Sequence, residues 1–157
     1  MTANPKPPVR VKARKSLKRT AKPRAKKNTC TIRACNRLPT AGVLCLTHAK
    51  ARADELWGAL VRKGRCDLAS IPIRCAGPIQ ACHGISRGYL GTRWDLDNGF
   101  SGCAAHNLYA ELRPLEWDEF LRRHWGDNYE EKRLRALNFG KGQKVDYAAV
   151  IAGLKGA

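Results

Sequence analysis

Seven cysteines and four histidines give this 157-residue chain a large supply of soft metal ligands. Its first residues lack the apolar core of a secretory signal, so we expect a reducing compartment. In such a compartment cysteines serve as metal ligands more often than as disulfides. An odd number of cysteines also fits poorly with complete disulfide pairing. The spacing of these residues should therefore identify metal sites.

The first predicted site is formed by Cys30-x4-Cys35-x9-Cys45-x2-His48. Zinc takes four nitrogen or sulfur ligands in a tetrahedron, and a pair of ligands on a tight turn supplies two of its corners. Because the protein would fill all four positions, no position stays open for a substrate. We therefore expect a structural zinc that contributes to the free energy of folding. The alternative is a set of thiols without a metal.

A second zinc site is expected downstream. The pair Cys103-x2-His106 repeats the spacing that ends the first site. Its simplest partners are Cys66 and Cys75, although Cys82 could take the place of Cys75. The sequence thus predicts a second structural zinc and leaves one thiol over.

Short elements must position these ligands, and their pattern predicts an α+β fold. Leu56, Trp57, Leu60 and Val61 form an apolar stripe in a helix over residues 47–63. Residues 65–103 are rich in Gly, Cys and Arg and show no helical period. Within that stretch, β-like pieces are expected at 70–75 and 97–103, and further helices are expected at 104–113, 115–125, 127–138 and 146–154.

The charge of the chain points to a polyanionic partner. Its formal net charge is +17, and the first 27 residues contain eleven Lys or Arg and no Asp or Glu. A segment of this composition cannot bury enough apolar surface to fold, so we expect a disordered basic arm. Nucleic acid is the favoured partner, because Lys and Arg release its condensed counterions. The arm residues expected to contact nucleic acid include Lys12, Arg14, Lys15, Lys18 and Arg19.

Four regions follow from these patterns. They are a disordered arm (1–28), a zinc knuckle with its helix (29–64), a central region with the second zinc (65–113) and C-terminal helices (114–157). No apolar run approaches the length of a membrane span, so a membrane is not expected as a partner.

The stretch QACHGISRGYLGTRWDLDNGFSGCAAHN, residues 80–107, resembles the ββα-metal (H-N-H) nucleases. The likeness is greatest to the NinG/Rap group of phage recombination endonucleases. It rests on His83, Arg87-Gly88, Arg93-Trp94-Asp95, Asn98 and the ending Cys103-x2-His106-Asn107. It runs from about Cys66 to Leu137, roughly half of the chain. The segment 30–48 is similar to the N-terminal zinc knuckle of some phage H-N-H proteins.

The resemblance implies a small zinc-stabilised ββα core that hydrolyses phosphodiester bonds in DNA. His83 would then be the general base, and Asn98 would brace the loop that orients it. Asn107 would hold the catalytic metal, Mg²⁺ or Mn²⁺, for which an oxygen ligand is suitable. The resemblance also implies branched or recombination-intermediate DNA (a Holliday junction or D-loop) as substrate, and the cytoplasm of a bacterial host as location. Resolvases generally need two active sites, which favours a homodimer.

Cys82 departs from the family's pattern, because many relatives have Asp or His before the general base. A thiolate is a poor ligand for Mg²⁺ and a good one for softer metals. Cys82 is therefore either a ligand of a softer catalytic metal or a packed thiol, and we favour the packed thiol.

Two arginines of the same stretch are candidates for binding the DNA backbone. Arg87 and Arg93 could clamp a phosphate, since a guanidinium binds phosphate through two parallel hydrogen bonds. The alternative, equally favoured for Arg93, is an ordinary solvated loop arginine.

Two other function classes fit the charge: a non-catalytic zinc protein that binds DNA, and a zinc protein associated with RNA or the ribosome. In the first of these classes His83 and Asn107 would be incidental, and the second offers no reason for the spacing of His83, Asn98 and Asn107.

Overall fold

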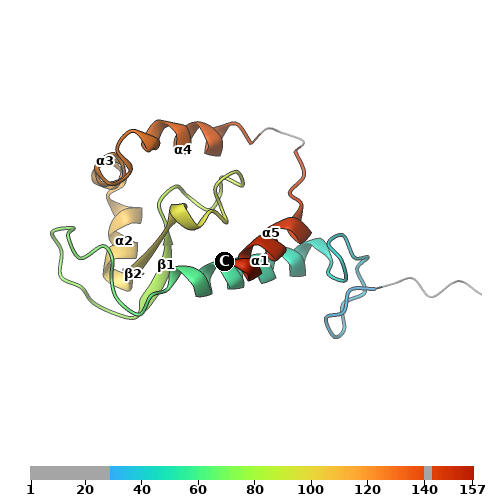
Figure 1. Cartoon of the computed structure of the whole chain (residues 1–157). Coiled ribbons are helices and arrows are strands. Elements are labelled where there is room, and N and C mark those ends of the chain that lie inside the picture. Colours follow the sequence, from blue (N-terminus) through green and yellow to red (C-terminus); the bar gives the residue numbers. More distant parts are fainter. Residues whose placement is uncertain (1–28, 140–142) are drawn as a thin grey trace, which may run out of the picture.

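The computed structural model describes residues 29–139 and 143–157, so the predicted basic arm at 1–28 and its candidate DNA-binding residues lie outside the described part. The described residues form helices around a small sheet, in agreement with the predicted α+β class (Figure 1). The elements are α1 (Leu46–Val61), β1 (Ile79–His83), the 3-10 helix η1 (Leu96–Asn98), β2 (Gly99–Cys103), α2 (Ala104–Leu112), α3 (Pro114–Trp125), α4 (Asn128–Leu137) and α5 (Tyr147–Gly156).

The two strands form an antiparallel ribbon that passes directly into a helix. Ile79 pairs with Cys103 at one end of the ribbon, and His83 pairs with Gly99 at the other. A long loop with η1 joins the strands, and α2 begins at the residue after β2. The order strand, loop, strand, helix therefore runs without interruption from residue 79 to residue 112.

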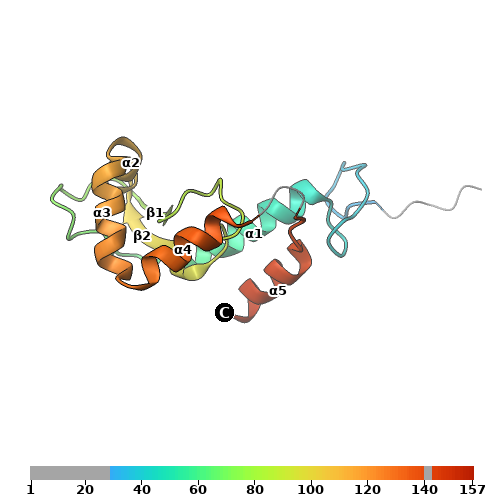
Figure 2. The ribbon, with the colours of Figure 1, turned by 90° about the horizontal axis from the view of Figure 1, so that it is seen from above.

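Helix α1 is the longest element and lies beside α5 and the ribbon (Figures 1 and 2). The cysteine-rich segment before α1 extends from its N-terminal end, and α2 and α3 lie at the other end of the molecule (Figure 2). Gly99 permits the close packing of α1 on β2: a Cβ at this position would lie 2.4 Å from a methyl carbon of Val61 and 3.0 Å from the Trp57 ring. Any side chain at residue 99 would therefore push α1 away from the sheet.

Two apolar cores hold these elements together. The first lies between α1, α5 and the loop that joins the strands, with Trp94 packed edge-on against Tyr147. The second lies between the other face of the ribbon and α3 and α4, and its buried members are Leu68, Ile71, Cys82, Phe100, Trp117, Leu121 and Tyr129. The ribbon thus separates a core built on α1 from a core built on α3.

Several predicted elements differ from the observed ones. Residues 70–75 do not form a strand: they fold as bends in which Ile71 donates its backbone N–H to the Leu68 carbonyl and packs into the second core. Of the predicted stripe on α1, Trp57 and Val61 are buried, whereas Leu60 is exposed. Small residues (Ala49, Ala53 and Gly58) take the remaining buried places. Within the described ranges, no helix is long and apolar enough to cross a bilayer.

Candidate metal centres and the cavity around His83

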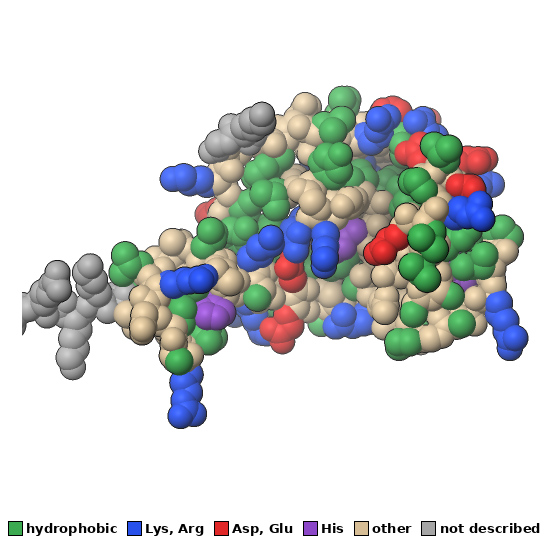
Figure 3. All heavy atoms as spheres, turned by 180° about the vertical axis from the view of Figure 1, so that it is seen from behind, with side chains coloured by type: hydrophobic (Ala, Val, Ile, Leu, Met, Phe, Trp, Pro, Cys, Tyr) green, Lys and Arg blue, Asp and Glu red, His purple; other side chains and the backbone are tan. Residues whose placement is uncertain are grey.

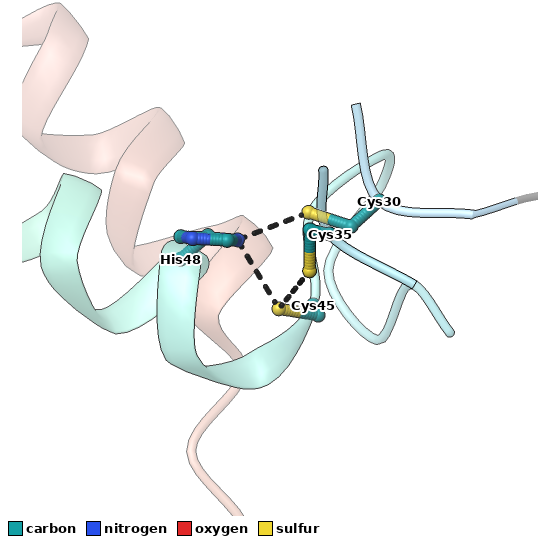
Figure 4. Close-up of side chains that lie close together, drawn as sticks. All are labelled: Cys30, Cys35, Cys45 and His48. Atoms are coloured by element: carbon teal, nitrogen blue, oxygen red, sulfur yellow. Dashed lines mark hydrogen bonds between the residues drawn. The ribbon is translucent and has the colours of Figure 1, made fainter. Parts of the chain in front are cut away.

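The first predicted ligand set comes together at the N-terminal end of α1 (Figure 4). The ligand atoms of Cys30, Cys35, Cys45 and His48 all lie within 4.8 Å of one another. The Sγ atoms of Cys35 and Cys45 are 3.8 Å apart, and His48 Nδ1 is 3.2 Å from Cys30 Sγ and 3.4 Å from Cys45 Sγ. A tetrahedral zinc site requires about 3.8 Å between sulfurs and about 3.5 Å between sulfur and nitrogen. This group could therefore hold a metal ion such as zinc.

The second ligand set is Cys66, Cys75, Cys103 and His106, again within 4.8 Å of one another. His106 Nδ1 lies 3.5 Å from Cys66 Sγ, 3.7 Å from Cys75 Sγ and 3.0 Å from Cys103 Sγ. Burial raises the pKa of Cys103, but hydrogen bonds from the His106 backbone N–H and ring outweigh it and lower that pKa to about 6. A thiolate is the form that binds metal, so this group could also hold an ion such as zinc.

A turn before β1 brings Cys75 to this second set. Gly77 has a φ of +76°, and a Cβ at Gly77 would lie 2.8 Å from the Cβ of Ala104. The backbone N–H groups of Ala104 and Ala105 donate to the carbonyls of Pro78 and Ala76. A glycine is therefore needed for the chain to press against the start of α2.

Cys82 lies apart from both ligand sets. Its side chain is 1% exposed in the second core, and burial raises the pKa of its thiol to about 11. The structure thus resolves the choice between Cys75 and Cys82 in favour of Cys75. It also favours the packed thiol over a ligand of a catalytic metal, because a buried neutral thiol binds metal poorly.

His83, at the end of β1, has a defined orientation. Its Nε2 lies 3.0 Å from the backbone carbonyl oxygen of Arg93, and its ring stacks on the indole of Trp57 with centroids 3.9 Å apart. A carbonyl only accepts hydrogen bonds, so we assign the proton of the neutral ring to Nε2 and the lone pair to Nδ1. Burial lowers the pKa of His83, which favours this neutral form.

Asn98 braces the loop between the strands through its side-chain amide. Its side chain is 1% exposed, and its Oδ1 accepts from the Ile85 backbone N–H at 2.6 Å. Its Nδ2 donates to the carbonyls of Ile85 and Thr92 at 3.0 and 3.1 Å. These bonds connect the residues that follow His83 to the end of the loop, and so they restrict the loop that carries the Arg93 carbonyl.

The Arg93 side chain forms an ion pair with Asp54 of α1, so it is not free to bind a phosphate. Nε and one terminal nitrogen of Arg93 donate to the two carboxylate oxygens of Asp54 at 2.9 and 2.8 Å. The other terminal nitrogen donates to the carbonyl of Arg87, and the Trp94 indole also donates to Asp54. Since Arg93 is only 8% exposed and its donors are engaged, the geometry favours a role in holding the loop on α1.

Asn107, the metal ligand implied by the resemblance, lies on α2 and donates from Nδ2 to the Gln80 side-chain oxygen at 2.8 Å. It does not line the cavity that contains His83, whereas Gln80 does. In residues 29–139 and 143–157, the two Cys₃His sets are the only places where three or more Cys, His, Asp or Glu side chains converge as a metal site would require. His83 belongs to neither of these sets.

The cavity beside His83 has a volume of about 540 Å³ and a mostly polar wall. Its lining residues are Asp54, Trp57, Gly58, Arg62, Ile79, Gln80, Ala81, His83, Arg87 and Arg93. Figure 3 shows Lys and Arg side chains gathered beside a histidine near the middle of one face. Four of the lining residues belong to α1 or its C-terminal cap.

Asp54, Trp57 and Arg62 were absent from the site predicted by sequence. The sequence did hold one signal for them. Asp54 is followed by Trp57 at i+3 and Gly58 at i+4, which places these three residues on one face of the helix. No protein family, curated protein or solved structure matches the chain, so the family resemblance rests on the residues alone.

Proposed function

We propose that this protein is a metal-dependent DNA endonuclease of the ββα-metal type, in which His83 is the general base. The observation that carries the proposal is the bond from His83 Nε2 to the Arg93 carbonyl, which leaves Nδ1 as the proton acceptor of a ring that lines an arginine-rich cavity. The uninterrupted order of strand, loop, strand and helix, with Asn98 bracing the loop, also supports it.

His83 Nδ1 would take a proton from a water molecule while the water oxygen attacks the phosphorus atom of the backbone. The bond from phosphorus to the leaving sugar oxygen then breaks, and one strand ends in a phosphate and the other in a hydroxyl. The stacked indole of Trp57 shields one face of the imidazole from solvent, which disfavours the charged form before reaction. The Arg93 carbonyl can stabilise the protonated ring that forms during the step.

A divalent metal such as Mg²⁺ would supply stabilisation of negative charge on the phosphate and on the leaving oxygen. Mg²⁺ usually keeps several waters and takes only one or two protein oxygens, so a single amide can contribute. Asn107 fits this chemistry by type, because its Oδ1 remains an acceptor, but its side chain lies behind Gln80 and not in the wall of the His83 cavity. Asp54 fits it poorly, since both of its oxygens accept from Arg93.

DNA is the proposed substrate because the cavity and the whole chain carry excess positive charge. Arg62, Arg87 and Arg93 line the cavity, whereas Asp54 is its only acidic lining residue and is paired with Arg93. The chain as a whole has a formal charge of +17.

Two further parts of the proposal follow from the family resemblance. The substrate would be branched or recombination-intermediate DNA, and a second copy of the chain would allow paired cuts. The two Cys₃His sets would hold structural zinc that fixes α1 and α2.

The decisive experiment compares the purified wild-type protein with the His83→Ala variant on supercoiled plasmid and on a synthetic four-way junction, with Mg²⁺ or Mn²⁺ present. We expect the wild type to cleave and the variant to lose at least about a hundredfold in rate, as for loss of a general base. DNA affinity at fixed salt should stay nearly unchanged. A wild-type protein that nicks neither substrate, or a variant that cleaves normally, would refute the proposal.

A second candidate function is a zinc protein that binds DNA without cutting it. The two closed Cys₃His sets favour it, because neither leaves a position for substrate. It predicts tight, salt-dependent binding with no metal-dependent cleavage by the wild type. A competition among duplex DNA, four-way junction and RNA of equal length distinguishes both DNA proposals from an RNA-binding role.

A further inference from the structure

Gly58 occupies an unusual place in the last turn of α1. It is buried in a helix interior, where glycine is less favourable than alanine. A Cβ at residue 58 would lie 3.0 Å from a terminal guanidinium nitrogen of Arg62 and 3.7 Å from its Cζ. The Arg62 guanidinium therefore lies back over the helix, one turn before its own backbone, on the surface that Gly58 leaves open.

This position brings Arg62 into the cavity that contains His83. Arg62 caps α1 with an extended backbone, and its N–H donates to the Gly58 carbonyl at 3.3 Å. Both Arg62 and Gly58 line the cavity, together with Arg87 from the loop after β1. In the described part of the chain, no ion pair engages the side chain of Arg62 or of Arg87, whereas the third arginine, Arg93, is paired with Asp54.

We infer that Arg62, seated on Gly58, is a binding residue for a backbone phosphate of the DNA strand that enters the His83 cavity. This inference rests on the proposed function and deepens it. A guanidinium without a carboxylate partner, in a polar cavity with excess positive charge, favours a phosphate oxygen as its acceptor. Arg62 comes from the C-terminal cap of α1 and Arg87 from the interstrand loop, and both line the cavity with His83, so two separate elements can each present a guanidinium to the strand.

The first test compares Arg62→Ala with Arg65→Ala on plasmid and four-way junction DNA. Arg65 is a suitable control, because its removal costs the same charge three residues along, its side chain is exposed and near Asp67, and it does not line the cavity. A phosphate contact made equally in the bound and transition states changes KM rather than kcat. We expect KM to rise on the order of tenfold for Arg62→Ala and little for Arg65→Ala. Equal KM values for the two variants would overturn the inference.

The second test measures DNA affinity against salt in the His83→Ala background, where the DNA stays uncut. Each phosphate contact contributes about 0.9 to the slope of log K against log salt concentration. We expect Arg62→Ala to reduce the magnitude of that slope by about one and Arg62→Lys to restore it. An unchanged slope in Arg62→Ala would contradict a phosphate contact.

The third test concerns the packing of the Arg62 guanidinium on Gly58. Gly58→Ala should raise helix stability, and the flexible end of Arg62 can move away from the new methyl group, so the variant should fold at least as well as the wild type. We nevertheless expect the KM of Gly58→Ala to rise, as it does for Arg62→Ala. An unchanged KM would show that the packing of Arg62 on Gly58 does not matter for DNA binding. The failures are distinguishable: a wild-type protein without cleavage refutes the proposed function and this inference together, whereas an Arg62→Ala variant equal to Arg65→Ala in an active enzyme refutes only the inference.

Discussion

The indole of Trp57 stacks on the imidazole of His83, with ring centroids 3.9 Å apart and planes inclined by 16°. The same indole donates from Nε1 to the backbone carbonyl of Asp95 at 3.0 Å. Helix α1 therefore holds the proposed general base and the interstrand loop through a single side chain. The orientation of His83 depends on a residue 26 positions away in the sequence, outside the stretch that resembles a nuclease.

Replacing Trp57 by Phe should reduce both the cleavage rate and the stability. A phenyl ring keeps much of the packing but loses the bond to Asp95, which should lower the free energy of unfolding by about 1–2 kcal/mol. The imidazole would lose its fixed plane, so we expect the cleavage rate to fall about tenfold or more. The ¹⁵N shifts of the His83 ring should change from those of a single Nε2–H tautomer toward a mixture.

Ile71→Val is the control for this loss of stability. Ile71 is buried in the other core, and its substitution should cost about 1 kcal/mol. Cleavage by this control should stay near the wild-type rate. A Trp57→Phe variant with normal cleavage and an unchanged His83 spectrum would show that the stack does not position the base.

Asp54→Asn should destabilise the loop that carries the Arg93 carbonyl. The substitution leaves the nearly buried Arg93 guanidinium without its carboxylate. Because Asp54 itself is more than a third exposed, solvent screens part of the loss, and we expect a decrease of about 2 kcal/mol in the free energy of unfolding. Glu55→Gln, which removes an exposed pair with Arg52, should cost less than about 0.5 kcal/mol by denaturant titration.

The effect of Asp54 on stability should also depend on pH. Burial raises the pKa of this carboxyl, but the hydrogen bonds from Arg93 and Trp94 outweigh it and hold the pKa below its ordinary value. The stabilisation is therefore complete above about pH 4, the unfolded value, and is lost as the pH falls through the lower folded value. The wild type and Asp54→Asn should thus converge in stability in strong acid, and a constant difference would contradict this ion pair.

The ligand sets could be predicted from the sequence because their pairs are local. Cys45-x2-His48 and Cys103-x2-His106 each lie at the start of a helix, where two ligands three residues apart face the same way. The choice between Cys75 and Cys82 was not local. It depends on the left-handed turn at Gly77, which brings Cys75 to α2.

The α1 side of the His83 cavity could not be predicted for the same reason. Asp54 meets Arg93 across 39 positions of sequence, and Trp57 meets His83 only because Gly99 lets α1 approach the ribbon closely. The apolar period of the helix favoured Leu60 as a buried residue, yet it is exposed. Small residues at 49, 53 and 58 decided which face of α1 is buried, and a hydrophobic pattern gives such residues little weight.

The cleavage rate should fall at acid pH only below the ordinary pKa of histidine. Burial lowers the pKa of His83, and the positive charges of Arg93 and Arg87 lower it further. The hydrogen bond to the Arg93 carbonyl and the negative charge of Asp54 act in the opposite direction and raise it, but the pKa stays below its ordinary value. Arg62 is the remaining charged group that lines the cavity from α1. The neutral base is then present at pH 6.5 and is lost as the pH falls through the lowered value.

Arg87→Ala should move this acid limb to higher pH, because it removes a positive charge that disfavours the imidazolium. Rates measured at saturating DNA separate this shift from any loss of affinity. Folding stability should also decline below pH 6.5, since the unfolded chain takes up a proton there and the folded His83 does not. An acid limb centred above pH 6.5 would contradict the buried, neutral base.

Metal analysis of two cysteine variants should separate the metal ligands from the packed thiol. We expect two zinc ions per wild-type chain by elemental analysis, one in each Cys₃His set. Cys75→Ser should lose one of them and much of its stability, because ligand binding and folding are coupled in such sites. Cys82→Ala should keep both ions and lose about 1–2 kcal/mol from the vacated space in the core.

The Cys82→Ala variant also tests the packing of the second core. A Cβ at residue 102 would lie 2.6 Å from Cys82 Sγ and 2.9 Å from Leu68 Cδ1, so both side chains fill the space at Gly102. Gly102→Ala alone should therefore destabilise this core, and adding Cys82→Ala should relieve only part of that loss, because the buried Leu68 must still shift away from the new methyl group. Loss of a zinc ion in Cys82→Ala, or retention of both in Cys75→Ser, would assign the fourth ligand to Cys82 instead.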